Sequence, residues 1–129
     1  MKTEIKGGLF EILAKIKAKP GLYLGSSSLS DLFIFLVGYK TARKELGIES
    51  TPAENKFYQE FHQFIETKYN LKTANSWAKI IMLYCSDERQ GFERFFQLLE
   101  DFKTLHSQEH HTDTINEKST LSYGHCLVR

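Results

Sequence analysis

The chain has little cysteine and little proline. Cys85 and Cys126 are the only cysteines among 129 residues, and neither has a second cysteine or a histidine at the spacing of a zinc site. A disulfide framework and a structural zinc site are therefore not expected, and no cofactor is predicted. We interpret both cysteines as buried free thiols in a reducing cytosol. The only prolines, Pro20 and Pro52, fall where helices are predicted to stop and to start.

Long apolar segments are also missing. The longest uninterrupted one, from Leu32 to Val37, is far shorter than the roughly 20 residues that span a bilayer. Charged residues from Glu11 to Lys19 interrupt the apolar residues near the start, so no secretory signal is visible. The formal net charge of +1 gives no general reason to expect nucleic acid or an anionic membrane as a partner. A cytoplasmic protein is therefore expected.

What the chain does have is a distinctive segment between two apolar stretches, Lys-Pro-Gly-Leu-Tyr-Leu-Gly at 19–25. It resembles the Arg-Pro-Gly-Met-Tyr-Ile-Gly segment of the DNA gyrase B and related ATPases, which precedes a helix that carries a catalytic Glu and a metal-binding Asn. Here the following stretch, 32–40, contains neither residue type, and no later Asp-x-Gly-x-Gly segment is present. The chain is also too short for that α/β domain. The ATPase interpretation is therefore set aside, and the protein is predicted not to be an enzyme.

The same segment has a local structural interpretation. Pro20 fixes its own φ and biases the preceding residue away from the helical region, so a helix is predicted to stop there. Pro20 and Gly21 fit the two central positions of a type II turn, of which the second needs a positive φ. Residues 22–24 can then run extended as a short hydrophobic strap, and Gly25 lets the chain turn again. The structural motif is thus Pro20, Gly21, Tyr23 and Gly25.

The periodicity of apolar residues predicts an all-α fold, with a single compact domain of about five helices. Ring-bearing residues are common, with ten Phe and six Tyr, so the core is expected to be rich in rings. Start signals are clearest at Ser28 and at Thr51. Thr51 is followed by Pro52 and, at the third helical position, by Glu54, as in a capping box. The predicted helices cover about 8–18, 28–46, 51–69, 75–84 and 87–106.

Two of these helices carry specific expectations. The middle of the second is apolar nearly all round, through Ile34, Phe35 and Val37, so this helix is predicted to lie in the centre of the domain. The last helix has polar residues on one side and a single apolar stripe on the other. That stripe consists of Phe92, Phe95, Phe96, Leu99 and Phe102.

Beyond the last helix the apolar pattern fails. Residues 1–106 are predicted to form the helical domain, and 107–129 a polar loop with a C-terminal arm that could pack on it. His110 and His111 are of metal-ligating type, but adjacent histidines on a loop rarely converge on one ion, so we interpret them as solvated. A metal site would gain weight only if His125 and Cys126 folded back beside them.

Two other clusters have both a structural and a functional interpretation. The lysines of 15–19 offset the dipole at a helix end, and would indicate nucleic acid only if they merged into one patch with the cations of 40–44. His62 and Glu66, at i and i+4, could serve a hydrolase as an acid–base pair if a serine converged on them. Such pairs are also common by chance.

The order of the motifs resembles a group of small uncharacterised bacterial proteins that are similar to immunity proteins encoded beside polymorphic or contact-dependent toxins. The shared features are the 19–25 segment, a Leu-x-x-Phe-x-x-Gly-Tyr helix at 32–39, an aromatic helix at 57–65, a tryptophan near Trp77 and the closing helix at 95–102. The resemblance covers roughly residues 9–102. It implies a non-catalytic protein that neutralises a toxin by stoichiometric binding.

Under that interpretation, the partner surface would combine charge with aromatic anchors. Many toxin domains are basic nucleases, so the acidic residues of the last helix, Glu93, Glu100 and Asp101, are the predicted contacts, with Tyr58 or Tyr23 as an anchor. Lysine at both Glu100 and Asp101 should then weaken binding without unfolding the domain. The alternative is a small helical adaptor or regulator, which could form a homodimer through surplus aromatic surface.

Overall fold

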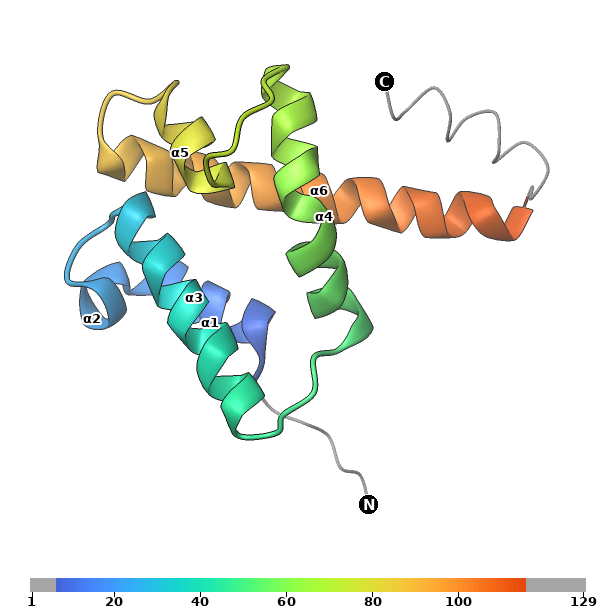
Figure 1. The fold of residues 1–129 in the computed structure, drawn as a ribbon, viewed down its shortest axis with the longest axis horizontal. Coiled ribbons are helices and arrows are strands. Elements are labelled where there is room, and N and C mark those ends of the chain that lie inside the picture. The colour runs from blue at the N-terminus through green and yellow to red at the C-terminus, as the bar shows by residue number, and fades with distance from the viewer. Residues whose placement is uncertain (1–6, 116–129) are drawn as a thin grey trace. The chain divides into compact units, whose positions relative to one another are not determined.

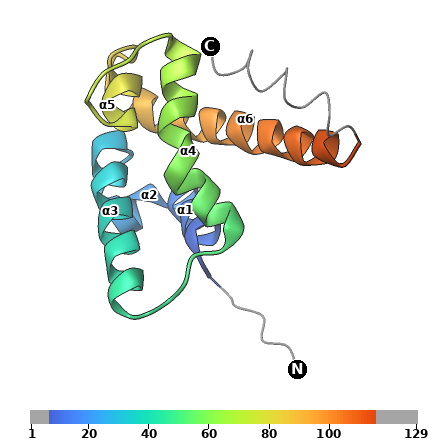
Figure 2. The same cartoon turned by 45° about the vertical axis from the view of Figure 1, so that its right-hand side comes forward.

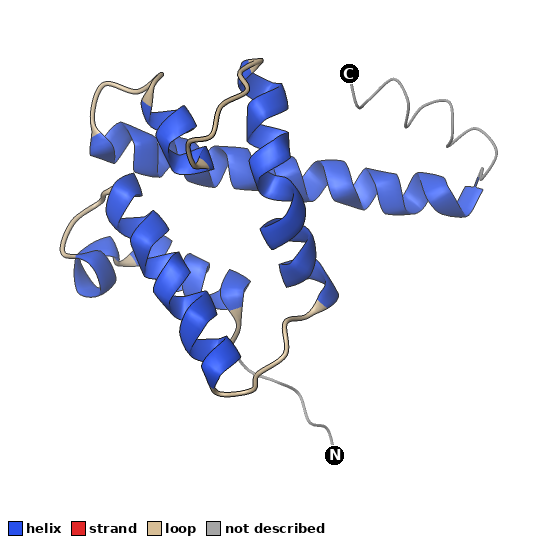
Figure 3. Cartoon of the chain, in the orientation of Figure 1, coloured by secondary structure: helices blue, strands red, loops and turns tan. Residues whose placement is uncertain are grey.

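The computed structural model describes residues 7–115, with side chains as far as residue 107, and this part of the chain is all-helical (Figures 1 and 3). The predicted fold class is therefore confirmed. The described residues form six helices and no strand. The helices are α1 (Leu9–Ala18), α2 (Pro20–Leu24), α3 (Leu29–Glu45), α4 (Pro52–Tyr69), α5 (Trp77–Met82) and α6 (Glu88–Ile115).

The chain divides into two compact units, Met1–Phe96 and Gln97–Arg129, and α6 runs through the boundary. The first unit contains α1 to α5 and the beginning of α6. Within it, the chain reverses between α3 and α4, so that α4 runs back in the opposite sense (Figure 2). The candidate site described below lies entirely in this first unit.

The predicted turn and strap at 20–24 are wrong, because these residues form the short helix α2. α1 does stop before Pro20, as expected, but Pro20 then opens a new helix, since its fixed φ also suits a first helical position. Gly21 is not among the residues with positive φ. Gly25 is, with φ of 86°, and its N–H donates to the Gly21 carbonyl oxygen at 3.1 Å to close the helix.

The predicted N-caps are confirmed. The Ser28 hydroxyl accepts from the backbone N–H of Asp31 at 3.1 Å, and Thr51 forms the full capping box with Glu54. Glu88, at the start of α6, adds an unpredicted contact: its carboxylate accepts from the backbone N–H of Ser30 at 2.8 Å and from the Ser30 hydroxyl at 2.7 Å. Burial acts to raise the pKa of Glu88, but these hydrogen bonds outweigh it and the pKa is lowered.

The core of the first unit combines buried Leu and Ile side chains with a cluster of aromatic rings. Phe61 of α4, Trp77 of α5 and Phe95 of α6 meet there, with ring centroids 5.1 Å apart for Phe61 and Trp77, 5.1 Å for Trp77 and Phe95, and 5.7 Å for Phe61 and Phe95. Of the predicted α6 stripe, Phe92, Phe95 and Phe96 belong to this unit and are buried; Leu99 and Phe102, in the second unit, are also buried. Packing of α4, α5 and the beginning of α6 around one tryptophan therefore fixes this part of the fold.

The prediction that the second long helix lies at the centre of the domain is wrong. α3 buries Leu29, Leu32 and Leu36, but Ile34 is 66% exposed and Val37 is 49% exposed. α2 and α5 contact α3, and the apolar pattern alone could not tell which faces such neighbours cover. α3 thus presents apolar side chains to the solvent beside the site described below.

The last helix is longer than predicted. The predicted end near His106 and the predicted loop at 107–115 are wrong, because α6 continues to Ile115. This stretch contains neither Gly nor Pro, so nothing in it obliges a helix to stop once the apolar stripe has ended. The predicted arm at 121–129, with His125 and Cys126, lies outside the described residues.

Candidate binding groove

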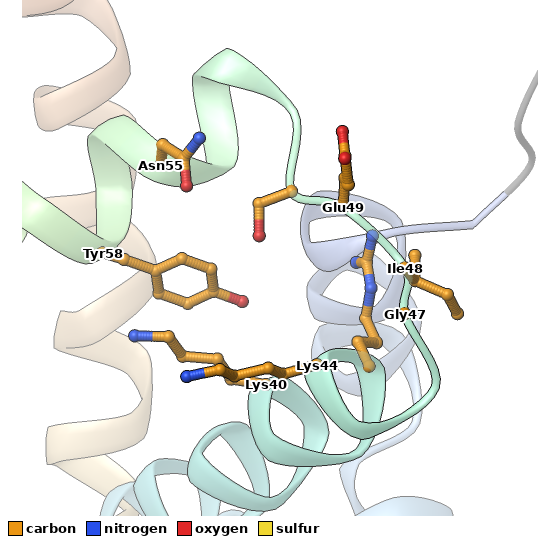
Figure 4. A pocket seen from close by; sticks show the side chains of 9 residues that line it. Lys40, Lys44, Gly47, Ile48, Glu49, Asn55 and Tyr58 are labelled. Atoms are coloured by element: carbon orange, nitrogen blue, oxygen red, sulfur yellow. The ribbon is translucent and has the colours of Figure 1, made fainter.

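A pocket of about 550 Å³ lies where the chain reverses between α3 and α4 (Figure 4). The end of α3, the connecting loop and the first turns of α4 each contribute to it. Its lining consists of Lys40, Arg43, Lys44, Gly47, Ile48, Glu49, Ser50, Asn55 and Tyr58. Gly47, with φ of 76°, ends the α3 segment and starts the loop, so backbone geometry as well as side chains shapes this pocket.

Arg43, one of the lining residues, forms an ion pair with Glu54, which lies behind the lining. Arg43 Nη1 donates to Glu54 Oε2 at 3.0 Å and Nη2 to Oε1 at 3.4 Å, and Glu54 is only 2% exposed. The same carboxylate accepts from the backbone N–H groups of Leu9 at 2.8 Å and Thr51 at 2.9 Å. Glu54 therefore ties the starts of α1 and α4 to the end of α3, and it neutralises the charge of Arg43.

The titration of Glu54 reflects these contacts. Burial acts to raise its pKa, but the hydrogen bonds from Leu9, Thr51 and Arg43 and the charge of Arg43 outweigh burial, so the pKa is lowered. The pKa of Arg43 is raised: burial acts to lower it, and Glu54 more than compensates. Both groups are thus charged at neutral pH.

Two other cations of the pocket have no such partner. Within the described residues, neither Lys40 nor Lys44 forms an ion pair with a carboxylate. The Lys40 Nζ atom lies 4.4 Å from the centroid of the Tyr58 ring, a cation–π distance. Figure 4 shows both lysine side chains running toward Tyr58, whereas Glu49 points away from that ring. The Tyr58 side of the pocket is therefore positively charged.

An apolar recess of about 170 Å³ adjoins the pocket and shares Lys40 and Tyr58 with it. Its other lining residues are Phe33, Leu36, Val37, Phe57, His62 and Trp77. Phe33 and Trp77 meet edge to face, with centroids 5.2 Å apart, and Val37 stands half exposed at the same place. We refer to the pocket and the recess together, with these residues, as the α3–α4 groove.

Tyr58, one of the two predicted anchors, lies at the junction of the pocket and the recess. It is half-buried, and burial and the nearby Glu54 raise its pKa against the opposing effect of Arg43. Tyr23, the other predicted anchor, lies on α2 and packs its ring against Phe35 at a centroid distance of 6.4 Å. The pocket and recess linings include Tyr58 but not Tyr23.

The three acidic residues predicted as contacts lie on α6 and do not line the groove. Glu93 is exposed and pairs with Arg89 at 3.3 Å. Glu100 pairs with Lys103 at 3.7 Å, and Asp101 is exposed. Neighbours on the same helix thus compensate two of these charges. From the sequence, Lys40, Arg43 and Lys44 are expected to bind a partner only as part of a nucleic-acid patch. Their i, i+3, i+4 spacing just before a glycine is the sequence signal that indicates a basic pocket at a helix end.

The basic clusters of α1 and α3 make separate contacts. Lys15 pairs with Glu11 at 3.7 Å, and the Lys17 Nζ atom lies 5.6 Å from the centroid of the Phe96 ring. Lys40 instead contacts Tyr58, on α4. Lys15, Lys17 and Lys19 line neither the pocket nor the recess.

The other chemical candidates can also be placed. His62 Nε2 lies 3.2 Å from Glu66 Oε2, and the recess that His62 lines contains no serine among the described residues. Nowhere in the described chain do three or more His, Cys, Asp or Glu residues converge as a metal site would require; the side chains of His110 and His111 are outside that description. Cys85 is a half-buried free thiol, and burial raises its pKa. None of the described helices is both long enough and apolar enough to span a bilayer.

Comparison of the chain with protein-family models, curated proteins and solved structures found no match. The groove must therefore be interpreted from its own residues.

Proposed function

We propose that this chain is a non-catalytic protein-binding module and that the α3–α4 groove is its binding surface. One observation carries the proposal: a basic pocket lies beside an apolar recess. In the pocket, Lys40 and Lys44 have no ion-pair partner among the described residues, and the recess is lined by half-exposed Val37. A protein partner gains binding free energy when it supplies an opposite charge to such lysines and buries the neighbouring apolar side chains. A partner that covered the groove would bury both features together.

The biological role we propose is inhibition of a cognate bacterial toxin by stoichiometric binding. The resemblance of the 19–25, 32–39 and 57–65 segments to immunity-type proteins supports this role. The binding surface we propose differs from the one expected from the sequence, which was the acidic side of α6. Lysine or arginine neighbours pair with two of the α6 acids, whereas Lys40 and Lys44 form no ion pair among the described residues. The alternative role is an adaptor or regulator, which could form a homodimer through exposed apolar residues such as Leu22 and Ile34.

The test begins with capture of the partner from the native host by the tagged full-length chain, followed by titration calorimetry with the purified partner. We expect a 1:1 complex that the double substitution Lys40→Glu/Lys44→Glu weakens and the double substitution Glu100→Lys/Asp101→Lys leaves unchanged. If instead Glu100→Lys/Asp101→Lys weakened the complex and Lys40→Glu/Lys44→Glu did not, the acidic residues of α6 would be the binding surface and not the groove. Recovery of only the chain itself, as a dimer, would favour the homodimeric alternative.

The toxin role has its own measurement. Expression of the captured partner in a laboratory bacterium should arrest growth, and co-expression of the wild-type chain should restore it. Rescue that persists unchanged with Lys40→Glu/Lys44→Glu would contradict the groove. If the captured partner did not arrest growth, the chain would still be a protein-binding module, but the proposed role as a toxin inhibitor would be wrong.

A further inference from the structure

We propose that the occupant of the α3–α4 groove is an acidic, amphipathic segment of the partner protein. A carboxylate of that segment would enter the basic pocket between Lys40 and Lys44, and a neighbouring aromatic or aliphatic side chain would enter the apolar recess. This inference rests on the proposed function and specifies which partner chemistry the groove recognises.

Charge favours an acidic residue at the wide end of the groove. Arg43 is already neutralised by Glu54 at 3.0 Å, and Glu49 points away from Tyr58. Lys40 and Lys44 are left as the cations that face the pocket without an ion-pair partner among the described residues. A partner carboxylate there would gain charge-assisted hydrogen bonds from one or both ammonium groups, with polar groups of Ser50 and Asn55 in the same lining.

Size and chemistry favour an apolar side chain at the narrow end. The recess of about 170 Å³ is smaller than the roughly 300–1,000 Å³ of typical small-molecule sites, so it suits a single side chain. Its walls are the rings of Phe33, Phe57 and Trp77 together with Val37. Phe57 is already buried, so a guest would remove from water mainly Val37 and the exposed parts of Phe33 and Trp77. Because Lys40 and Tyr58 line both spaces, the acidic and apolar groups of the guest must be close neighbours.

Nucleic acid fits this arrangement less well than an acidic segment. Binding to phosphates grows with the number of cations that contact the backbone, and the groove offers only Lys40 and Lys44 beside the neutralised Arg43. The lysines of α1 make their contacts elsewhere, at Glu11 and Phe96. A purely apolar guest, in turn, would leave the two ammonium groups in the interface without a partner.

The experiment selects ligands without assuming the partner. A phage library of random 12-residue peptides is panned on the full-length wild-type chain, and the consensus peptide is measured by fluorescence anisotropy against variants. We expect a consensus with Asp or Glu next to a Trp, Phe, Leu or Ile. Binding should weaken about tenfold or more with Lys40→Glu/Lys44→Glu and with Val37→Asp. The matched charge reversal Lys72→Glu/Lys79→Glu, at exposed lysines outside the groove, should change it less than about twofold.

Several results would overturn the inference. They are a basic or purely apolar consensus, no enrichment at all, or equal binding to the wild-type chain and the groove variants. The inference would also be overturned if a 20-nucleotide single-stranded DNA bound the chain more tightly than the consensus peptide does, and if Lys40→Glu/Lys44→Glu abolished that binding. If the captured natural partner still binds 1:1 but ignores the groove variants, the groove assignment fails while the protein-binding function stands. Circular dichroism of each variant, and the milder Lys40→Ala/Lys44→Ala, separate loss of binding from loss of fold.

Discussion

At the scale of single residues, Glu54 is the group on which the site most depends. It is buried, it pairs with Arg43, and it accepts from the backbone N–H groups of Leu9, at the start of α1, and of Thr51, the N-cap of α4. We expect Glu54→Gln to lower the free energy of unfolding by about 3 kcal/mol, because it leaves Arg43 uncompensated in a largely buried position. Urea denaturation measures this. Glu93→Gln breaks an exposed pair and should stay within about 0.5 kcal/mol of wild type; equal effects of the two would contradict the assigned role of Glu54.

The same carboxylate predicts a pH dependence. Because the pKa of Glu54 is lower in the folded chain than its ordinary value of 4.5, its contribution to stability is complete above about pH 4.5. That contribution is lost as the pH falls through the folded-state value. Denaturation curves between pH 7 and pH 3 should therefore show a smaller loss of stability for Glu54→Gln than for the wild-type chain. If the free energy of unfolding fell equally with pH in both chains, the pKa of Glu54 would not be lowered by its contacts.

At the scale of the helices, two glycines should respond in opposite ways to alanine. Gly38 is exposed within α3, and a Cβ there would meet nothing within 4 Å, so Gly38→Ala should stabilise by about 0.5–1 kcal/mol through helix propensity. At Gly91 of α6 a Cβ would lie 2.5 Å from Met82 Sδ and 3.3 Å from the Leu29 side chain. Gly91→Ala should therefore destabilise by about 1 kcal/mol or more. Thermal unfolding of the two variants checks this, and a gain at both positions would contradict the close packing at Gly91.

Local signals predicted the helices better than their surroundings. Thr51, Pro52 and Glu54 specify the start of α4 by capping chemistry that involves only neighbours in the sequence, and the structure confirms it. The Pro20-Gly21 pair suits both a type II turn and the first positions of a helix, so local reasoning could not choose α2. The exposure of Ile34 could not be predicted for a different reason, because the composition of a helix does not indicate which of its faces other helices cover.

The groove was only partly predictable for the same reason. The sequence predicts Tyr58 as an anchor and shows Lys40, Arg43 and Lys44 as a group of cations. What the sequence could not show is that the loop after Gly47 turns α4 back alongside these cations, or that Glu54 neutralises only Arg43. Both depend on contacts between separate helices, which follow no sequence period.

At the scale of the whole molecule, binding through Lys40 and Lys44 should depend on salt. These two lysines are exposed, so raising the ionic strength from about 0.01 M to 1 M, which shortens the Debye length from about 30 Å to 3 Å, should weaken the complex with an acidic partner. Calorimetric titrations over this range should show a clear salt slope for the wild-type chain and a reduced one for Lys40→Ala/Lys44→Ala. A salt-independent affinity would argue against the lysines as contacts.

We propose that a partner covers the α3–α4 groove. The most direct test of this proposal is an NMR titration of the ¹⁵N-labelled full-length chain with the purified partner, in which amide shifts are followed residue by residue. We expect the largest changes to cluster at residues 33–58 and near Trp77, with little change at Glu93, Glu100 and Asp101. Changes concentrated along α6, with the groove residues unmoved, would contradict it.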